Sequence, residues 1–281
     1  MRAVYINLDA AEARRESIEL SFASALRPGW SLDRYPAVNV NAPGYSGPRL
    51  KATAGSGRKL SAGEEGCYLS HRAVIDAHAR SAEPILVLED DAVFAPESLE
   101  IIDGFCSSDQ AKEWDVIFTD VIIPDASGMV ELFRLKRALP PKKIQVLDLG
   151  KRAFAGSTAY IAMPGALSAL PEFLRESRSE RAPFDMALRS LVYRKVIRAC
   201  VLFPFPTTVS TEGDASQIQS TSVVSSADLL WNAFRRIAWL GSNEEELTLT
   251  LQTIDEHYVD APARALGTIV AAMGSKRYVV K

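Results

Sequence analysis

The sequence contains few cysteines, and they follow no pairing pattern. Cys67, Cys106 and Cys200 are the three present in 281 residues, and no two of them lie close together in the chain. A disulfide framework and a zinc site made of neighbouring cysteines are therefore not indicated. Free thiols suit a reducing compartment, so we expect a cytoplasmic protein.

Long hydrophobic runs and an excess of one charge are also missing. No segment reaches the roughly 20 apolar residues of a membrane span, and Asn7 and Asp9 interrupt the first apolar stretch, which does not fit a signal peptide. The chain has 32 basic and 35 acidic residues, whereas nucleic-acid-binding proteins normally show a basic excess. We expect a soluble protein with no nucleic-acid partner. Peripheral association with the inner face of the cytoplasmic membrane stays open.

Apolar runs that alternate with helical patterns predict an α/β domain with a mainly parallel central sheet flanked by helices. The expected strands are 4–8, 35–40, 85–88, 116–118, 156–163 and 196–203. Helices are expected after Asp9 (with Ile18, Leu20 and Phe22 inward), after Ser61, over 96–105, around Gly165 and from Asp185. Residues 121–139 are expected to form shorter strands or loops. This domain is predicted to span residues 1–224.

The C-terminal residues 225–281 are predicted to form a small helical appendage, because 229–240 and 247–258 are amphipathic. Two polar segments without periodicity, 41–59 and 207–226, are expected to be loops that order over a site.

The apolar run 85–88 ends in three consecutive acids, Glu89, Asp90 and Asp91. A short run without polar residues is typical of a central parallel strand, and open α/β sheets bind ligands at the carboxyl ends of such strands. Three carboxylates there repel one another unless a cation or hydrogen-bond donors neutralise them. A hard divalent ion that bridges a diphosphate would do so. The structural alternative is a solvated acidic loop.

Strand pleating separates these three acids. Glu89 and Asp91 are expected to point to one side, and Asp90 to the other. Glu89 and Asp91 are therefore the candidate metal ligands. Asp90 is a candidate for contacting the ribose of a nucleotide or for holding the turn.

A longer pattern precedes the triplet. The segment LSAGEEGCYLSH at 60–71, followed by ILVLEDD at 85–91, resembles the glycosyltransferases of family 25. Weaker segments follow in the family's order over residues 1 to about 220. They are YINL at 5–8 with Arg14-Arg15, WDVI at 114–117, GSTAY at 156–160, Asp185, and Glu212 with Ser216 and Ile218.

The resemblance implies a GT-A fold, a nucleotide-sugar donor (usually UDP-galactose), Mn²⁺ or a similar ion such as Mg²⁺, and inversion at the anomeric carbon. The family includes bacterial lipopolysaccharide β-galactosyltransferases and collagen galactosyltransferase domains. A bacterial surface glycan or glycolipid is accordingly the expected acceptor. Glu89 and Asp91 match the outer acids of the family's metal motif.

Inversion requires a base near the acceptor hydroxyl. Asp185 is the candidate, because it stands at an expected helix start where the family also has an acid. The alternative is that Asp185 only caps this helix.

Four further residues are candidates for binding the donor. Asn7 and Arg14 follow the first strand, where such folds receive the nucleotide, and arginine suits phosphate by its geometry. Glu64 has a sufficient structural explanation in a capping box. His71 either contacts a phosphate, orders the loop, or is a satisfied core histidine.

Two features receive a structural interpretation. Cys67 is interpreted as packed helix core and not as a nucleophile. The basic residues are expected on a solvated face, which an anionic glycolipid or membrane surface could exploit. They are Lys136, Arg137, Lys142 and Lys143.

The leading hypothesis is thus an inverting, metal-dependent hexosyltransferase. The alternative is a catalytically silent sugar-nucleotide-binding or scaffold protein with the same fold. A metal-dependent phosphohydrolase ranks third, because the sequence offers no further His/Asp cluster for a two-metal centre. Neither the acceptor linkage nor the oligomeric state follows from the sequence.

Overall fold

The computed structural model describes residues 1–50, 59–176, 182–211 and 226–242, and the statements below concern this part of the chain. The strands of its main sheet are β1 (Arg2–Asn7), β2 (Ser31–Pro36), β3 (Ile85–Glu89), β5 (Val116–Phe118), β6 (Gln145–Asp148), β7 (Ala159–Ala162) and β8 (Ala199–Phe203). Their order across the sheet is β2-β1-β3-β7-β5-β8-β6. A second, small sheet pairs β4 (Ala92–Phe94) with β9 (Thr207–Val209).

The main sheet is mixed but mainly parallel. β1 pairs in parallel with β2 and β3, and β5 pairs in parallel with β8. β7 runs antiparallel to both of its neighbours, β3 and β5, and β6 runs antiparallel to β8. All strands except β6 and β7 therefore point the same way. The predicted α/β class with a mainly parallel sheet is confirmed.

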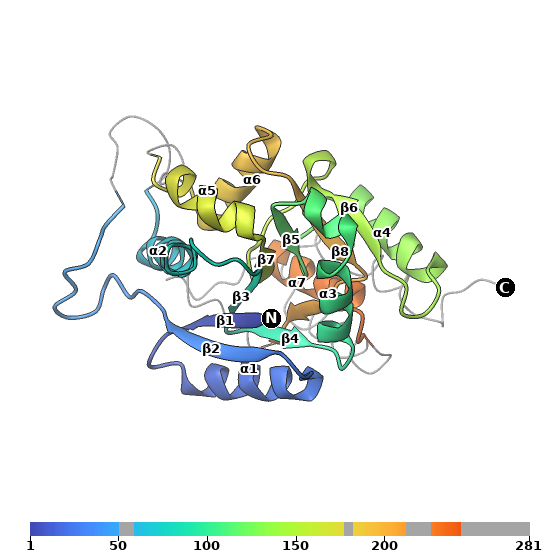
Figure 1. The fold of residues 1–281 in the computed structure, drawn as a ribbon, viewed down its shortest axis with the longest axis horizontal. Coiled ribbons are helices and arrows are strands. Elements are labelled where there is room, and N and C mark those ends of the chain that lie inside the picture. The colour runs from blue at the N-terminus through green and yellow to red at the C-terminus, as the bar shows by residue number, and fades with distance from the viewer. Residues whose placement is uncertain (51–58, 177–181, 212–225, 243–281) are drawn as a thin grey trace.

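Helices cover both faces of the sheet (Figure 1). They are α1 (Glu12–Ala25), α2 (Ala62–Ala77), α3 (Ser98–Cys106), α4 (Ala126–Ala138), α5 (Pro164–Leu174), α6 (Phe184–Tyr193) and α7 (Ser226–Ala238), with the short 3-10 turns η1 (Asp109–Glu113) and η2 (Leu149–Lys151). Alternating strand side chains divide the core: Ala3 and Tyr5 pack with α1 and α3, whereas Val4 and Ile6 pack with α2 and the helices that follow α3. Alternate side chains of β1 thus belong to two hydrophobic cores, one on each face of the sheet.

Most predicted elements are present, and differences are concentrated at weakly patterned segments. The second strand is Ser31–Pro36 and not 35–40, because it is a partly exposed edge strand without an apolar run. Leu20 is 72% exposed, since two helical steps from Ile18 lead to the opposite face. Residues 126–138 form α4 and not strands or loops. Asp125 caps this helix, and Met129 and Leu132 are its buried face.

The described part of the expected appendage packs against the main sheet. Leu230, Phe234 and Ile237 of α7 belong to the same hydrophobic core as the sheet strands. Backbone bonds join Phe205 N to Ala238 O at 3.0 Å and Leu240 N to Phe205 O at 2.8 Å. The second predicted helix, 247–258, lies outside the described residues. The division at residue 224 therefore stays a prediction.

Lys136 corrects the expectation of a purely solvated basic face. Its ammonium group donates to the carbonyls of Ile237 and Trp239, each at 2.6 Å, and to the hydroxyl of Ser242. A lysine that satisfies the last carbonyls of a helix also complements the negative end of its dipole. Lys136 therefore fastens α4 to the C-terminal end of α7.

A buried ion pair fixes α7 to the sheet. The guanidinium of Arg235 donates from Nε to Asp120 Oδ1 at 2.8 Å and from Nη2 to Asp120 Oδ2 at 2.5 Å. The two side chains are 4% and 0% exposed. Arg235 Nη2 also donates to Thr158 Oγ1 at 2.7 Å, next to the start of β7. This pair joins residues 115 positions apart in the chain.

We expect Arg235→Met to lower the free energy of unfolding by about 3–5 kcal/mol, because it leaves Asp120 buried and unpaired. Urea denaturation of the full chain would measure it. The double variant Arg235→Met/Asp120→Leu should recover part of the loss, since neither charge then remains buried. Lys112→Met is the control, because its pair with Asp109 is exposed. Equal effects of Arg235→Met and the control would contradict a core position for α7.

Candidate functional site

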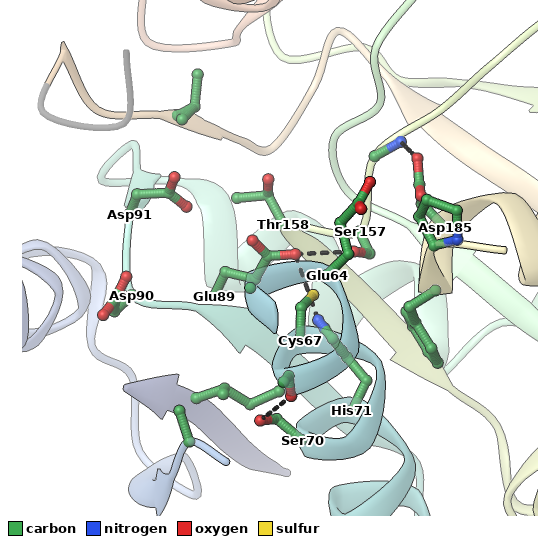
Figure 2. A pocket seen from close by; sticks show the side chains of 18 of the residues that line it. Glu64, Cys67, Ser70, His71, Glu89, Asp90, Asp91, Ser157, Thr158 and Asp185 are labelled. Atoms are coloured by element: carbon green, nitrogen blue, oxygen red, sulfur yellow. Dashed lines mark hydrogen bonds and ion pairs between the residues drawn. The ribbon is translucent and has the colours of Figure 1, made fainter. Parts of the chain in front are cut away.

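A cavity of about 810 Å³ opens at the ends of β1 and β3, a volume typical of sites for small ligands. Figure 2 shows its interior. One side is lined by Ile6, Leu8 and residues 37–39; the acidic turn after β3 lies in the middle. The start of β7, the start of α6 and one face of α7 line the other side. The cavity therefore crosses the point where the sheet changes direction between β3 and β7.

Glu89 is the last residue of β3, and two donors hold its carboxylate. Oε1 accepts a hydrogen bond from Ser157 Oγ at 2.8 Å and lies 3.3 Å from His71 Nε2. Burial favours the neutral acid, but the bonds from His71 and Ser157 outweigh it and lower the pKa of Glu89. Glu89 is therefore held as an oriented carboxylate in the cavity.

Asp90 is compensated by different groups. Its carboxylate accepts from Asn7 Nδ2 at 2.7 Å and from Arg14 Nη1 at 3.0 Å. The amide of Asn7 also donates to Ala11 O and accepts from Arg34 Nε, and Asn7 is 1% exposed. Asn7 therefore acts on the site through Asp90, while Arg14 also lines the cavity. Asp90 holds the turn, one of its two predicted roles.

Asp91 differs from its neighbours because its Oδ1 atom is buried without a hydrogen-bond partner. Burial and the nearby Glu89 carboxylate raise the pKa of Asp91 to about 7. The backbone carbonyl of Asp91 accepts from Ser210 N at 2.8 Å. In Figure 2 its side chain and that of Glu89 lie apart from the carboxyl group of Asp90. The strand ends at Glu89, and Asp90 and Asp91 form a turn, so the pleat on which the prediction rested does not reach Asp91. All three acids line the cavity.

His71 lies behind Glu89 and is 1% exposed. Its Nδ1 atom is 3.2 Å from the hydroxyl of Tyr160, and its ring stacks on Phe184 with centroids 4.3 Å apart and an 8° angle between the planes. Both ring nitrogens therefore face protein groups. This geometry favours a histidine that orients Glu89 over one that contacts a phosphate directly.

The capping box predicted for the next helix is confirmed. The Glu64 amide donates to Ser61 Oγ at 3.1 Å, and the Ser61 amide donates to Glu64 Oε2 at 2.8 Å. Glu64 also lines the cavity, so the structural role does not remove it as a contact for a ligand. Gly66 follows, and a Cβ atom there would lie 2.4 Å from Val38 O. A glycine is therefore required for α2 to approach residue 38 so closely.

Cys67 corrects one interpretation. It is half-buried and lines the cavity, so it is not packed core. Burial and nearby carboxylates, Glu89 above all, raise its pKa well above that of an ordinary thiol. A thiol with a raised pKa is a poor nucleophile, in agreement with the second half of the interpretation.

Asp185 is the second residue of α6 and does not cap it. The N-cap position is Pro183, and the helix has no side-chain cap. Asp185 Oδ2 accepts instead from the backbone N–H of Gly156 at 2.9 Å, and Asp185 lines the cavity. Gly156 has φ = +89°, which a side chain would strain. The structure thus overturns the capping alternative and presents a carboxylate at the wall of the cavity.

Arg235, like Ser157, is a site residue that sequence reasoning missed. It reaches the cavity from α7, together with Asp228, Trp231 and Asn232, which have the spacing of one helix face. Its charge acts on both Glu89 and Asp91. The sequence offered little signal for Arg235, because its helix face also carries the polar Asp228 and Asn232.

The sequence matches a known protein family. The family model described as glycosyltransferase family 25 (LPS biosynthesis protein) matches residues 1–187, well over half of the chain. The chain belongs to glycosyltransferase family 25. It is therefore a glycosyltransferase, as segments 60–71 and 85–91 predicted. Every site residue from Asn7 to Asp185 lies within the match, and Arg235 lies beyond it.

Comparisons outside the family are weaker. The chain is similar to the galactosyltransferase LgtC, whose crystal structure contains donor and acceptor sugar analogs. The similarity covers 72% of this chain and 73% of that chain, at 10% identity and a TM-score of 0.36, which is too low to support an argument. No curated protein matches the sequence. None of the described helices is long and apolar enough to cross a membrane.

We expect Asp91→Asn to stabilise the metal-free enzyme at pH 8 and not at pH 4. The native carboxyl has a pKa raised from 3.8 to about 7. Between these values the unfolded chain has released a proton that the fold still holds, so stability falls as pH rises through this window, and above pH 7 the fold carries the full cost of the buried charge. An amide removes this cost, on the order of 1 kcal/mol, or roughly 2–4 °C in Tm. Thermal melts in EDTA would measure it; equal destabilisation at both pH values would contradict the assignment.

Proposed function

We propose that this family 25 enzyme transfers a hexose, galactose from UDP-galactose, to a hydroxyl of a bacterial surface glycan such as lipopolysaccharide. We further propose that transfer inverts the anomeric carbon and requires a divalent ion, Mn²⁺ or Mg²⁺. One observation carries the proposal. Asp91, with its unpartnered oxygen, lines the same cavity as the oriented carboxylate of Glu89, whose charge acts on it, and the cavity is large enough for a nucleotide sugar.

The residues around Asp91 fit a hard divalent ion. Glu89 and Asp91 supply carboxylate oxygens, the donors that Mg²⁺ and Mn²⁺ prefer. A cation would also remove the repulsion that raises the pKa of Asp91. We assign Glu89 and Asp91 as the residues that hold the ion. When bound, the ion would act as a Lewis acid that stabilises the charge of the leaving diphosphate.

The protein's own cations support placing the diphosphate at the acidic turn. Arg14 and Arg235 approach Glu89, Asp90 and Asp91 from opposite sides of the cavity, α1 and α7. Residues 37–39, at the ends of β1 and β2, form the wall next to Arg14. Ligands of open α/β sheets bind beyond the carboxyl ends of such strands. We therefore propose that the nucleoside lies along this wall, with Arg14 and Asp90 near its ribose and diphosphate.

Asp185 is the proposed base. It lies across the acidic turn from the nucleoside wall, where the start of α6 meets Gly156. In the proposed reaction the acceptor oxygen forms a bond to the anomeric carbon, and the bond from that carbon to the diphosphate breaks. The proton of the acceptor hydroxyl passes to a carboxylate oxygen of Asp185. Glu64, on the same cavity, is the further candidate contact for donor or acceptor.

His71 has a supporting role in this proposal. Tyr160 and Phe184 fix its ring, and its Nε2 atom faces Glu89. A partner that orients a metal ligand and keeps it deprotonated commonly sets affinity for the ion. We therefore regard His71 as a positioning residue behind Glu89.

A panel of nucleotide sugars tests the function. We expect the purified chain to release UDP from UDP-galactose with Mn²⁺ and not with EDTA, and to form a product of inverted configuration with a lipopolysaccharide acceptor. Asp91→Asn should lower this turnover at least 100-fold, and the exposed Asp109→Asn variant should not. Full activity of Asp91→Asn in EDTA would contradict the metal assignment. UDP binding without release across the panel would favour the catalytically silent alternative.

We expect Asp185→Asn to lower kcat by about 10²–10⁴-fold with little change in the KM for donor. An amide keeps an oxygen that can accept from Gly156 N–H but cannot take up a proton. The thermal stability should therefore change little while kcat falls. Steady-state kinetics over pH, with Asp109→Asn as control, would measure this. A variant that loses stability but keeps kcat would show a purely structural role.

A further inference from the structure

A second set of metal-binding side chains meets at the floor of the same cavity. Cys67 Sγ, His71 Nε2 and a carboxylate oxygen of Glu89 all lie within 4.8 Å of one another. All three residues line the cavity. Figure 2 shows the sulfur of Cys67 beside the dashed line that joins His71 to Glu89.

We propose that Cys67, His71 and Glu89 bind a thiophilic divalent ion such as Zn²⁺, and that this ion inhibits transfer. Thiolate and imidazole ligands select zinc, whereas carboxylate oxygens alone suit Mn²⁺ and Mg²⁺. The site differs in chemistry from the Glu89–Asp91 pair but shares Glu89 with it. Zinc that engages Glu89 removes a ligand from the proposed donor ion.

The distances suit tetrahedral coordination. Zinc bonds to nitrogen and oxygen of about 2.0–2.2 Å, at tetrahedral angles, require ligand atoms roughly 3.4 Å apart. His71 Nε2 and Glu89 Oε1 are 3.3 Å apart. The sulfur bond is about 2.3 Å long, and Sγ already lies within 4.8 Å of the other two ligand atoms. The open cavity leaves the fourth position for water or an anion.

The histidine is already arranged as metal-binding histidines are. In such sites the second ring nitrogen is held by a hydrogen bond that fixes the orientation of the ring. Here Nδ1 faces the hydroxyl of Tyr160, and the ring is stacked on Phe184. Nε2 therefore points into the cavity without a change of rotamer.

Local sequence places the two soft ligands together. Cys67 and His71 are four residues apart in α2 and so share one face of the helix. Gly66, beneath Val38 O, sets how closely α2 approaches the sheet. The close approach of α2 thus places the side chains of Cys67 and His71 next to Glu89, at the end of β3. On zinc binding the Cys67 thiol gives its proton to the buffer and the thiolate bonds to the ion. His71 binds as the tautomer whose ring proton is on Nδ1, facing the Tyr160 hydroxyl, so Nε2 gives up its hydrogen bond to Glu89 and bonds to the ion.

Cobalt titration of the full chain, stripped of metal and desalted, tests the proposal without any need for turnover. We expect one equivalent of Co²⁺ to give a thiolate-to-cobalt charge-transfer band and the visible bands of a four-coordinate ion. One equivalent of Zn²⁺ should remove both. Cys67→Ser should abolish the charge-transfer band and weaken zinc binding at least tenfold. Cys106→Ser is the matched control and should keep both.

A second arm measures inhibition. Zn²⁺ should inhibit Mn²⁺-dependent release of UDP by the wild type and by Cys106→Ser. Cys67→Ser should be at least tenfold less sensitive, relative to its own zinc-free rate. A missing charge-transfer band in the wild type, or a band that persists in Cys67→Ser, would overturn the zinc site. If no sugar nucleotide is turned over, the proposed function fails while the cobalt spectrum still decides the zinc site.

Discussion

Repulsion among the three carboxylates that follow β3 is the constraint on which the site depends. Each acid meets a different environment: His71 and Ser157 hold Glu89, Asn7 and Arg14 hold Asp90, and Asp91 retains a buried oxygen without a partner. Carboxylates so close in the chain repel one another, and the protein does not supply hydrogen-bond donors for every oxygen. The pKa of Asp91 is raised for this reason and because Asp91 is buried. The unsatisfied member, Asp91, is the one for which we propose an external cation.

The same constraint explains why a helix from beyond the family match returns to the sheet. Arg235 pairs with Asp120 and Thr158, and its charge extends to Glu89 and Asp91. A fully buried arginine is costly unless its donors are satisfied, and Asp120 supplies most of what it needs. The pair thereby stabilises a positive charge beside the acidic turn. Fold and site share this one interaction, so α7 is part of both.

Local chemistry made part of this predictable. The capping box at Ser61 follows from a spacing of three residues, and the buried strand β3 follows from its apolar run; the structure has both. Contacts between residues far apart in the chain have no comparable pattern in the local sequence. Asp120 and Arg235 are 115 residues apart, and the edge strand β2 lacks an apolar run because only β1 covers it in the sheet. Pairing partners of that kind are set by tertiary packing, which a local pattern does not encode.

Glu89 links the two kinds of chemistry that the cavity offers. On one side Asp91 adds a second hard oxygen, and on the other Cys67 and His71 add soft ligands. One carboxylate cannot serve both ions fully, so occupancy of one side weakens the other. The stacking of His71 on Phe184 holds the imidazole ring so that Nε2 is directed at Glu89. In these two proposals the position of α2 would set the selectivity between metals, and the close approach of Gly66 to Val38 O sets that position.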